Sequence, residues 1–187
     1  GTDWNAINSG LENTVIVVES LAIDPKNTGA LYAGASACFQ PSGSPGFVEG
    51  GTNLCYRPGV FKTTNGGESW TGASAGLPWE SVEFGFILTL ASDPHAPSTV
   101  YAAGGGRIFK TTDGGASWSG LPMGARALVI DPQNPSILYA AGAYGAAAGI
   151  FKTVDGGASW TGSGTRRAQA QFTPEAVSAY QRVRTED

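Results

Sequence analysis

The sequence predicts an all-β chain built from one repeated unit of four short strands. An eight-residue phrase occurs three times, as TTNGGESW at Thr63–Trp70, TTDGGASW at Thr111–Trp118 and TVDGGASW at Thr153–Trp160. A second phrase, of the type Leu-Ala-Ile-Asp-Pro, precedes each copy. Charged residues make up only 14% of the 187 residues and glycine occurs 28 times, a composition that suits short strands joined by many turns.

The eight-residue phrase predicts a tight turn between two strands. Its paired glycines can adopt positive φ without steric cost. The carboxylates of Asp113 and Asp155, and the amide oxygen of Asn65, can accept hydrogen bonds from amides of the turn. The closing tryptophan is expected to point inward between neighbouring sheets. We therefore favour a structural turn over a sugar or ion site. This structural role is assigned to Asn65, Gly67, Trp70, Asp113, Gly115, Trp118, Asp155, Gly157 and Trp160.

The phrase resembles the Asp-box, or BNR-type, repeat S/T-x-D-x-G-x-S/T-W of β-propeller proteins, with Asn65 replacing the aspartate in the first copy. Proteins with this repeat include sialidases, other glycosidases, sorting receptors and assembly factors. The resemblance therefore implies a fold and does not specify an activity. In that family the boxes usually lie far from the active face, which agrees with a structural role.

The second phrase completes the repeated unit. It places an aspartate before a proline, which predicts a turn; the three aspartates are Asp24, Asp93 and Asp131. A Leu/Val-Tyr-Ala strand follows, and then a Val/Ile-Phe-Lys-Thr strand that enters the eight-residue phrase. Four short strands in about 40 residues are the signature of a propeller blade. The lysines of the third strand are expected on a solvated strand face; they are Lys62, Lys110 and Lys152.

The strands of each blade are named A to D from the axis outward. Blade one is predicted to have strands near Val15–Ile23, Ala30–Ala35, Val60–Thr64 and Ser69–Thr71. Blade two is predicted to have strands near Gly85–Ala91, Thr99–Ala103, Arg107–Thr112 and Ser117–Ser119. Blade three is predicted to have strands near Ala125–Ile130, Ile137–Ala141, Ile150–Val154 and Ser159–Thr161. Trp4–Ile7 is predicted to be a spare D strand from a blade whose other strands are missing.

These strands divide the chain into blades and a tail. The propeller part covers residues 1–163: the spare strand in 1–11, blade one in 12–75 with an insertion at 36–58, blade two in 76–121 and blade three in 122–163. The tail covers 164–187, where Thr173, Pro174 and Glu175 have the character of a helix start. A short docked helix and a frayed tail are both open interpretations of this tail.

Function is expected on the face of the disc that carries the B–C and D–A links. The A–B and C–D turns repeat and lie on the opposite face, whereas the links are irregular, and a rigid scaffold often positions functional loops. The candidate ligand-binding residues are Tyr56, Arg57, Trp79, Glu80, Glu83, Phe84, Arg107, Arg126 and Tyr144. Trp79 could stack on a sugar while Glu80 hydrogen-bonds it, or the indole could simply pack over the rim of blade two.

The sequence gives weak support for catalysis. Glycosidases need two carboxylates about 5–9.5 Å apart, and the weak candidates are Glu49, Glu80 and Glu83. The arginine triad and the F/Y-R-I-P motif of sialidases are not found. The single histidine, His95, lies in an Asp-Pro turn, which argues against a Ser-His-Asp triad. No cofactor is predicted, and two cysteines with one histidine argue against zinc.

Composition also bears on partners and location. The net charge of −4 argues against a nucleic-acid groove or an anionic membrane surface. The sequence contains no run of 18 apolar residues, so no membrane span is expected. Cys38 and Cys55 bracket the insertion of blade one, and a disulfide is favoured over two free thiols. A disulfide implies an oxidising compartment, hence an extracellular or periplasmic protein.

The sequence thus favours a non-catalytic extracytoplasmic module that recognises a glycan or a protein through its loop face. One alternative is a fragment of a polysaccharide hydrolase, such as the large two-propeller glucanases that carry these boxes. Another is a purely structural unit of a larger assembly. Propellers have about four to eight blades, and three blades leave open edges. We therefore expect a homo-oligomer or a longer parent chain.

Overall fold

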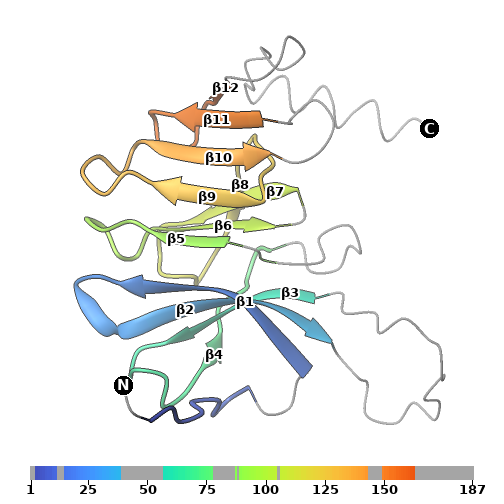
Figure 1. Ribbon diagram of the computed structural model, residues 1–187, viewed down its shortest axis with the longest axis vertical. Helices are drawn as coiled ribbons and strands as arrows, with labels where there is room; N and C mark the ends of the chain where they lie inside the picture. The colour runs from blue at the N-terminus through green and yellow to red at the C-terminus, as the bar shows by residue number, and fades with distance from the viewer. Residues whose placement is uncertain are drawn as a thin grey trace, which may run out of the picture.

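The computed structural model describes residues 3–11, 15–38, 57–77, 87, 89–104, 106–142 and 149–162 (Figure 1). These residues form three four-stranded antiparallel sheets, and none of them is helical. The predicted all-β class is therefore confirmed. The expected helix or tail at 164–187 lies outside the described residues. None of the described residues belongs to a helix long and apolar enough to cross a membrane.

Each sheet is a meander in which consecutive strands are neighbours. Blade one contains β1 (Val15–Asp24), β2 (Asn27–Cys38), β3 (Arg57–Thr63) and β4 (Thr71–Gly72). Blade two contains β5 (Thr89–Ser92), β6 (Val100–Gly104), β7 (Arg107–Thr111) and β8 (Ser119–Gly120). Blade three contains β9 (Ala127–Ile130), β10 (Leu138–Gly142), β11 (Gly149–Thr153) and β12 (Thr161–Gly162).

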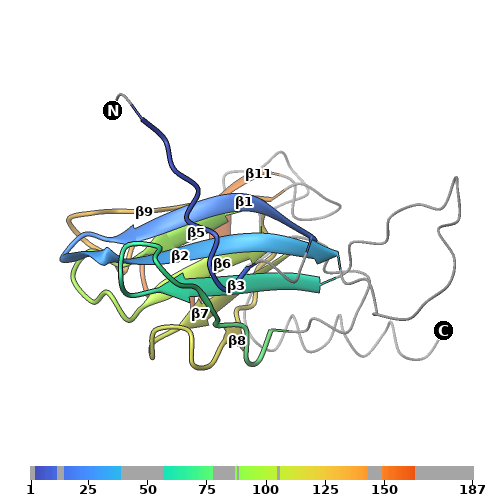
Figure 2. The same cartoon turned by 90° about the horizontal axis from the view of Figure 1, so that it is seen from below.

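The three blades stack in chain order, from blade one at the bottom of Figure 1 to blade three at the top. Their first strands are in contact along the stack, β1 with β5 and β5 with β9. The view from below in Figure 2 shows β1, β2 and β3 lying side by side across the end of the stack. The arrangement is that of consecutive blades in a β-propeller.

Strand register gives every blade the same two faces. One face carries a tyrosine paired with a lysine on the next strand, and we call it the leading face. Its rows are Ala22–Tyr32–Lys62, Ala91–Tyr101–Lys110 and Val129–Tyr139–Lys152. Neighbouring residues point to the opposite face, because side chains alternate along a strand; we call this the trailing face. Its rows are Leu21–Ala33–Phe61, Leu90–Ala102–Phe109 and Leu128–Ala140–Phe151.

The hydrophobic core lies between successive blades. The leading face of blade one packs on the trailing face of blade two, where Leu90, Phe109 and Trp118 are buried. The leading face of blade two packs in the same way on blade three, where Phe151 and Trp160 are buried. The eight-residue phrase is called the box from here on. The predicted position of its tryptophan between neighbouring sheets is confirmed for Trp118 and Trp160. Trp70 is also buried, but no second sheet covers it among the described residues. The contact between two successive blades is called a junction. The junctions stabilise the fold, because each sheet buries its apolar face only against a neighbouring blade.

The D strands begin later than predicted. In blade one, β4 starts at Thr71, whereas the prediction began at Ser69. The reason is that the preceding amides are already bound outside the ladder: Ser69 N–H donates to the side chain of Asn65. The Trp70 N–H donates to the carbonyl oxygen of Ser9. The strand prediction at Trp4–Ile7 was wrong, since residues 3–8 form no strand.

Candidate functional site

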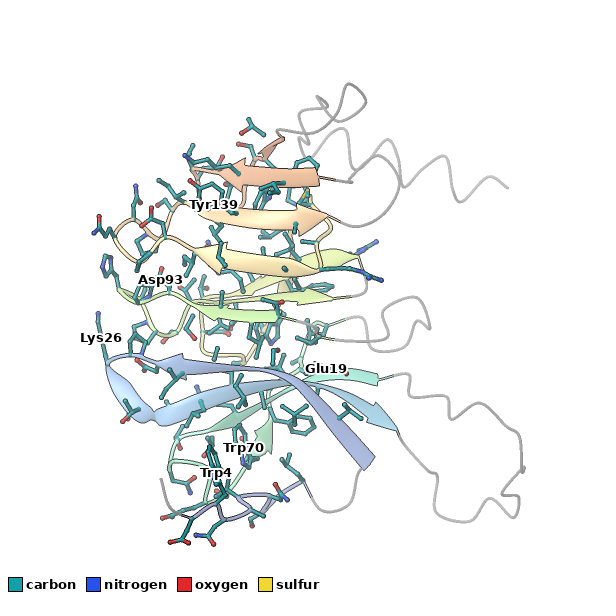
Figure 3. The ribbon with its side chains drawn as sticks, viewed as in Figure 1. Trp4, Glu19, Lys26, Trp70, Asp93 and Tyr139 are labelled. Atoms are coloured by element: carbon teal, nitrogen blue, oxygen red, sulfur yellow. The ribbon has the colours of Figure 1, made fainter. Side chains whose placement is uncertain are left out.

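The Asp-Pro turns join the A and B strands at one end of the stack, called the A–B end. Each turn is held by hydrogen bonds to its own aspartate. Asp93 Oδ1 accepts hydrogen bonds from the backbone N–H groups of His95 at 2.8 Å and Ala96 at 3.0 Å. Equivalent bonds are made by Asp24 and Asp131. The ammonium of Lys26 donates to the carbonyl oxygen of His95 at 2.6 Å, linking the turns of blades one and two; Figure 3 shows Lys26 and Asp93 on this side of the stack. The predicted turn role of these aspartates is confirmed.

The polar groups of the box of blade two form hydrogen bonds with one another. Buried Thr111 donates its hydroxyl hydrogen to Asp113 Oδ1 at 2.6 Å. The same hydroxyl oxygen accepts the N–H groups of Asp113 at 3.3 Å and Gly115 at 3.0 Å. Ser117 donates its N–H to Asp113 Oδ1 at 2.9 Å and its hydroxyl hydrogen to Oδ2. The carboxylate therefore serves the turn, because both of its oxygens accept hydrogen bonds from within the same turn.

Blade one makes the same turn with asparagine. Thr63 donates to Asn65 Oδ1 at 2.7 Å, and Ser69 N–H donates to the same oxygen at 3.0 Å. The second carboxylate oxygen is replaced by Nδ2, which donates to the Ser69 hydroxyl oxygen at 3.0 Å. The serine hydroxyl accepts here, whereas it donates in the other two boxes. Because a hydroxyl can do either, the turn tolerates the loss of the charge.

Hydrogen bonding holds both box carboxyl groups in the charged form. The side-chain hydrogen bonds of Ser117 and Thr111 lower the pKa of Asp113 from its ordinary value of 3.8 to about 2. Burial raises the pKa of Asp155, but hydrogen bonds from Ser159 and Thr153 outweigh it and lower that pKa also to about 2. Neither group can act as a general acid near neutral pH. Across the described ranges, no group of three or more His, Cys, Asp or Glu residues could hold a metal ion.

The box tryptophan of blade two is held by the chain that leaves blade one. The Trp118 indole N–H donates to the carbonyl oxygen of Ala73 at 2.7 Å, and its backbone N–H donates to that of Ala75 at 2.9 Å. Gly76 lies against the Trp118 backbone with φ of +85°, and a Cβ there would stand 2.6 Å from the Trp118 carbonyl oxygen. Glycine is required at this position because a side chain would collide with the neighbouring blade.

The N-terminal segment makes the same contacts with blade one. The Trp70 indole N–H donates to the carbonyl oxygen of Ile7 at 2.8 Å, and its backbone N–H donates to that of Ser9 at 2.8 Å. Trp4 is 95% exposed. Residues 4–11 therefore correspond one by one to residues 70–77, as Gly10 and Gly76 illustrate. The segment occupies the place of a chain leaving a preceding blade.

On the leading faces of blades one and two, a tyrosine–lysine pair holds the box of the next blade. The Lys62 ammonium donates to the carbonyl oxygen of Gly114 at 3.0 Å and lies 5.2 Å from the Tyr32 ring centroid. Lys110 repeats both contacts: it donates to Gly156 O at 3.3 Å and lies 5.2 Å from the ring of Tyr101. The Tyr101 hydroxyl donates to the same carbonyl oxygen at 3.2 Å. The predicted solvated role of these two lysines was wrong.

The junction between blades two and three differs in the contact made by the indole of its box tryptophan. Leu121 takes the place of Ala73, and a Cβ on Gly157 would stand 2.6 Å from its Cδ1 atom. The Trp160 indole N–H donates to the carbonyl oxygen of Gly157 in its own blade at 3.1 Å. The larger leucine therefore fills the space by apolar contact, where blade one supplies a backbone acceptor.

The structure places only part of the predicted ligand face. Arg57 and Arg107 are the first residues of β3 and β7, and exposed Arg126 precedes β9, so all three lie at the end of the stack that carries the B–C and D–A links (Figure 1). The Arg126 backbone is fixed by Thr89 Oγ1 and by the carbonyl oxygen of Ala141. The remaining candidates lie outside the described residues: Glu49, Tyr56, Trp79, Glu80, Glu83, Phe84 and Tyr144. Cys38 ends β2 and Cys55 is not described, so the disulfide stays a prediction.

Comparisons with known proteins support the fold. No protein-family model matches the sequence, and a search of the curated proteins found no match. Among solved structures, the chain is similar to a GH74 enzyme of Niastella koreensis, with 24% identity, a TM-score of 0.53 and coverage of 78% of this chain and 22% of that one. A GH74 xyloglucanase from Xanthomonas campestris gives 18% identity, a TM-score of 0.54 and coverage of 83% and 21%.

YCF48 from Cyanidioschyzon merolae is also similar, with 16% identity, a TM-score of 0.50 and coverage of 80% of this chain and 40% of that one. The chain thus spans about a fifth to two fifths of the length of these structures. At this level of identity the likeness is one of fold alone. Together with the three stacked sheets, it identifies the chain as consecutive blades of a β-propeller.

Proposed function

We propose that the chain is a non-catalytic, extracytoplasmic scaffold whose stacked blades hold the B–C and D–A loops for binding a glycan or a protein. The observation that carries this proposal is that the recurring polar side chains make hydrogen bonds within the scaffold. Thr111, Asp113 and Ser117 close a turn, and Lys62 and Lys110 hold the next blade. The repeated groups build the scaffold, which leaves binding to residues that do not recur, such as Trp79 and Glu80.

A glycan array followed by titration calorimetry tests the binding role. The intact protein is expected to bind a subset of glycans, and Trp79→Ala is expected to weaken that binding by roughly 2- to 12-fold, the value of one stacked aromatic contact of about 0.5–1.5 kcal/mol. Lys26→Ala, at the opposite A–B end of the stack, is the matched control and should bind as the parent does. Equal binding by Trp79→Ala and the parent would reject this site.

A fragment of a polysaccharide hydrolase is the second candidate, favoured by the likeness to two GH74 enzymes. Glu80 and Glu83 would then be the carboxylates to test, because glycosidases act with a pair of carboxyl groups. Turnover of a β-glucan that Glu80→Gln abolishes, with binding retained, would establish this candidate over the scaffold. Binding without turnover by the parent chain would reject it.

A further inference from the structure

The two ends of the stack expose faces that are covered everywhere else. On the leading face of blade three, Tyr139 is 39% exposed and Ile150 is 59% exposed. Their counterparts in blade two, Tyr101 and Ile108, are 1% and 0% exposed because blade three covers them. The Lys152 ammonium lies 5.5 Å from the ring centroid of Tyr139, so the tyrosine–lysine pair is already assembled.

The trailing face of blade one is open along β1, although Ala33 and Ala35 on β2 are buried. Leu21 is 62% exposed, whereas its counterpart Leu90 in blade two is 8% exposed. A Cβ on Gly66 would meet nothing within 4 Å, whereas one on Gly114 would meet the Lys62 ammonium at 2.8 Å and the Tyr32 hydroxyl at 3.3 Å. The box turn of blade one is thus formed but lacks the lysine and tyrosine that the other boxes receive.

We propose that the leading face of blade three binds the trailing face of blade one in a second copy of this chain. In this junction Lys152 and Tyr139 of one copy donate to the carbonyl oxygen of Gly66 in the other, as Lys110 and Tyr101 do to Gly156. The inference names a partner for the scaffold of the proposed function and rests on that role. A second copy is the occupant because this chain carries both halves of a junction that it makes twice internally.

The N-terminal segment prepares blade one for this junction. Residues 7–11 already cover Trp70 in the place of a preceding chain, so the second copy has to supply only the faces of its A, B and C strands. Residues 5 and 6 correspond to β4 (Thr71–Gly72). In the proposed junction this place is taken by β12 of the copy that contributes blade three. Residues 3–6, with exposed Trp4, must therefore move aside as the two copies meet.

Two such junctions close a two-fold ring. Each copy would offer its leading face to the other's trailing face, giving six blades, within the usual range of about four to eight for propellers. Every contact is between unlike faces, but the closed pair is still symmetric. The proposal therefore predicts a dimer with no exposed sheet face at either end.

Sedimentation velocity of the full chain, over a wide concentration range, tests this proposal. The parent is expected to be a dimer. Ile150→Asp should break the leading face and Leu21→Asp the trailing face, each weakening dimerisation by roughly 30-fold or more, as loss of an interface hot spot does. Val154→Asp is the matched control: Val154 is 64% exposed but lies in the box turn, at the position of Thr112, which stays exposed beside a complete junction.

Mixing the two defective variants identifies the contact. Ile150→Asp keeps a sound trailing face and Leu21→Asp a sound leading face, so an equal mixture should regain one junction and sediment as a dimer. A monomeric parent, or a dimer that survives either substitution, would overturn the proposal. So would a mixture that stays monomeric, because the dimer would then use like faces or another surface. The glycan array reports on the loop face separately, so the outcome for one proposal does not decide the other.

Discussion

At the residue scale, the threonine that opens each box organises the turn. Buried Thr111 donates one hydrogen bond and accepts two, including the N–H of buried Gly115. Thr63 and Thr153 do the same in their own blades. A β-branched hydroxyl residue fits here because it continues the strand and also supplies both a donor and acceptors.

Replacing Thr111 by valine tests this role. The shape is kept, but the N–H of Gly115 loses its acceptor in a buried place, which costs about 1–3 kcal/mol of unfolding free energy. Thr112→Val changes the exposed neighbour and should be close to neutral. Urea denaturation of the two variants measures the difference. Equal free energies of unfolding would show that the threonine hydroxyl is not needed.

The box carboxylates predict a loss of stability in acid. The pKa of Asp113 and of Asp155 is about 2 in the folded chain, below the ordinary value of 3.8. Their contribution is complete above pH 3.8 and is lost as the pH falls from 3.8 through about 2, because the unfolded chain binds the proton first. Replacing both by asparagine, which blade one already uses, should flatten the melting temperature across this interval. An unchanged acid slope would contradict the assignment.

At the element scale, glycines allow one blade to approach the next closely. Gly76 and Gly106 both have positive φ, +85° and +73°. Only Gly76 has a backbone oxygen of the neighbouring blade where its Cβ would be. The two positions therefore separate the effect of backbone strain from that of close approach.

Alanine at these two glycines gives a matched pair. Gly106→Ala should cost about 1–2 kcal/mol, the usual cost of positive φ for a residue with a Cβ. Gly76→Ala should cost that amount and roughly 1–3 kcal/mol more from overpacking against Trp118. Thermal and urea unfolding measure both. Equal losses would mean that the chain at Gly76 can move away from blade two.

The elements also show what the sequence could and could not predict. The three blades were predictable because two phrases recur in step, and the turns were predictable because Asp, Pro and Gly have few backbone options. The starts of the D strands were not, because Ser69 and Trp70 donate their backbone N–H groups to acceptors outside the sheet. The lysine contacts were missed because a strand pattern shows which side chains share a face, but not what lies opposite it.

At the scale of the whole molecule, part of the candidate site was predictable from the sequence and part was not. The recurring residues could be assigned to the scaffold from the sequence, since recurrence within one chain marks what every blade needs. The tyrosine–lysine pair could have been found from its recurrence on neighbouring strands, but its acceptor, a backbone carbonyl oxygen, has no sequence signature. The loop residues do not recur, and Trp79 and Glu80 therefore remain predictions.

The central claim is that, in the part of the chain that the structure describes, the stack is open and only blade two is covered on both faces by neighbouring blades. Amide hydrogen exchange, measured by mass spectrometry at a dilution where the chain is monomeric, tests it most directly, because exchange reports local opening. The amides of β6 and β7 should exchange more slowly than those of β10 and β11, whose leading face carries exposed Tyr139 and Ile150. Equal or greater protection in β10 and β11 would contradict the open stack.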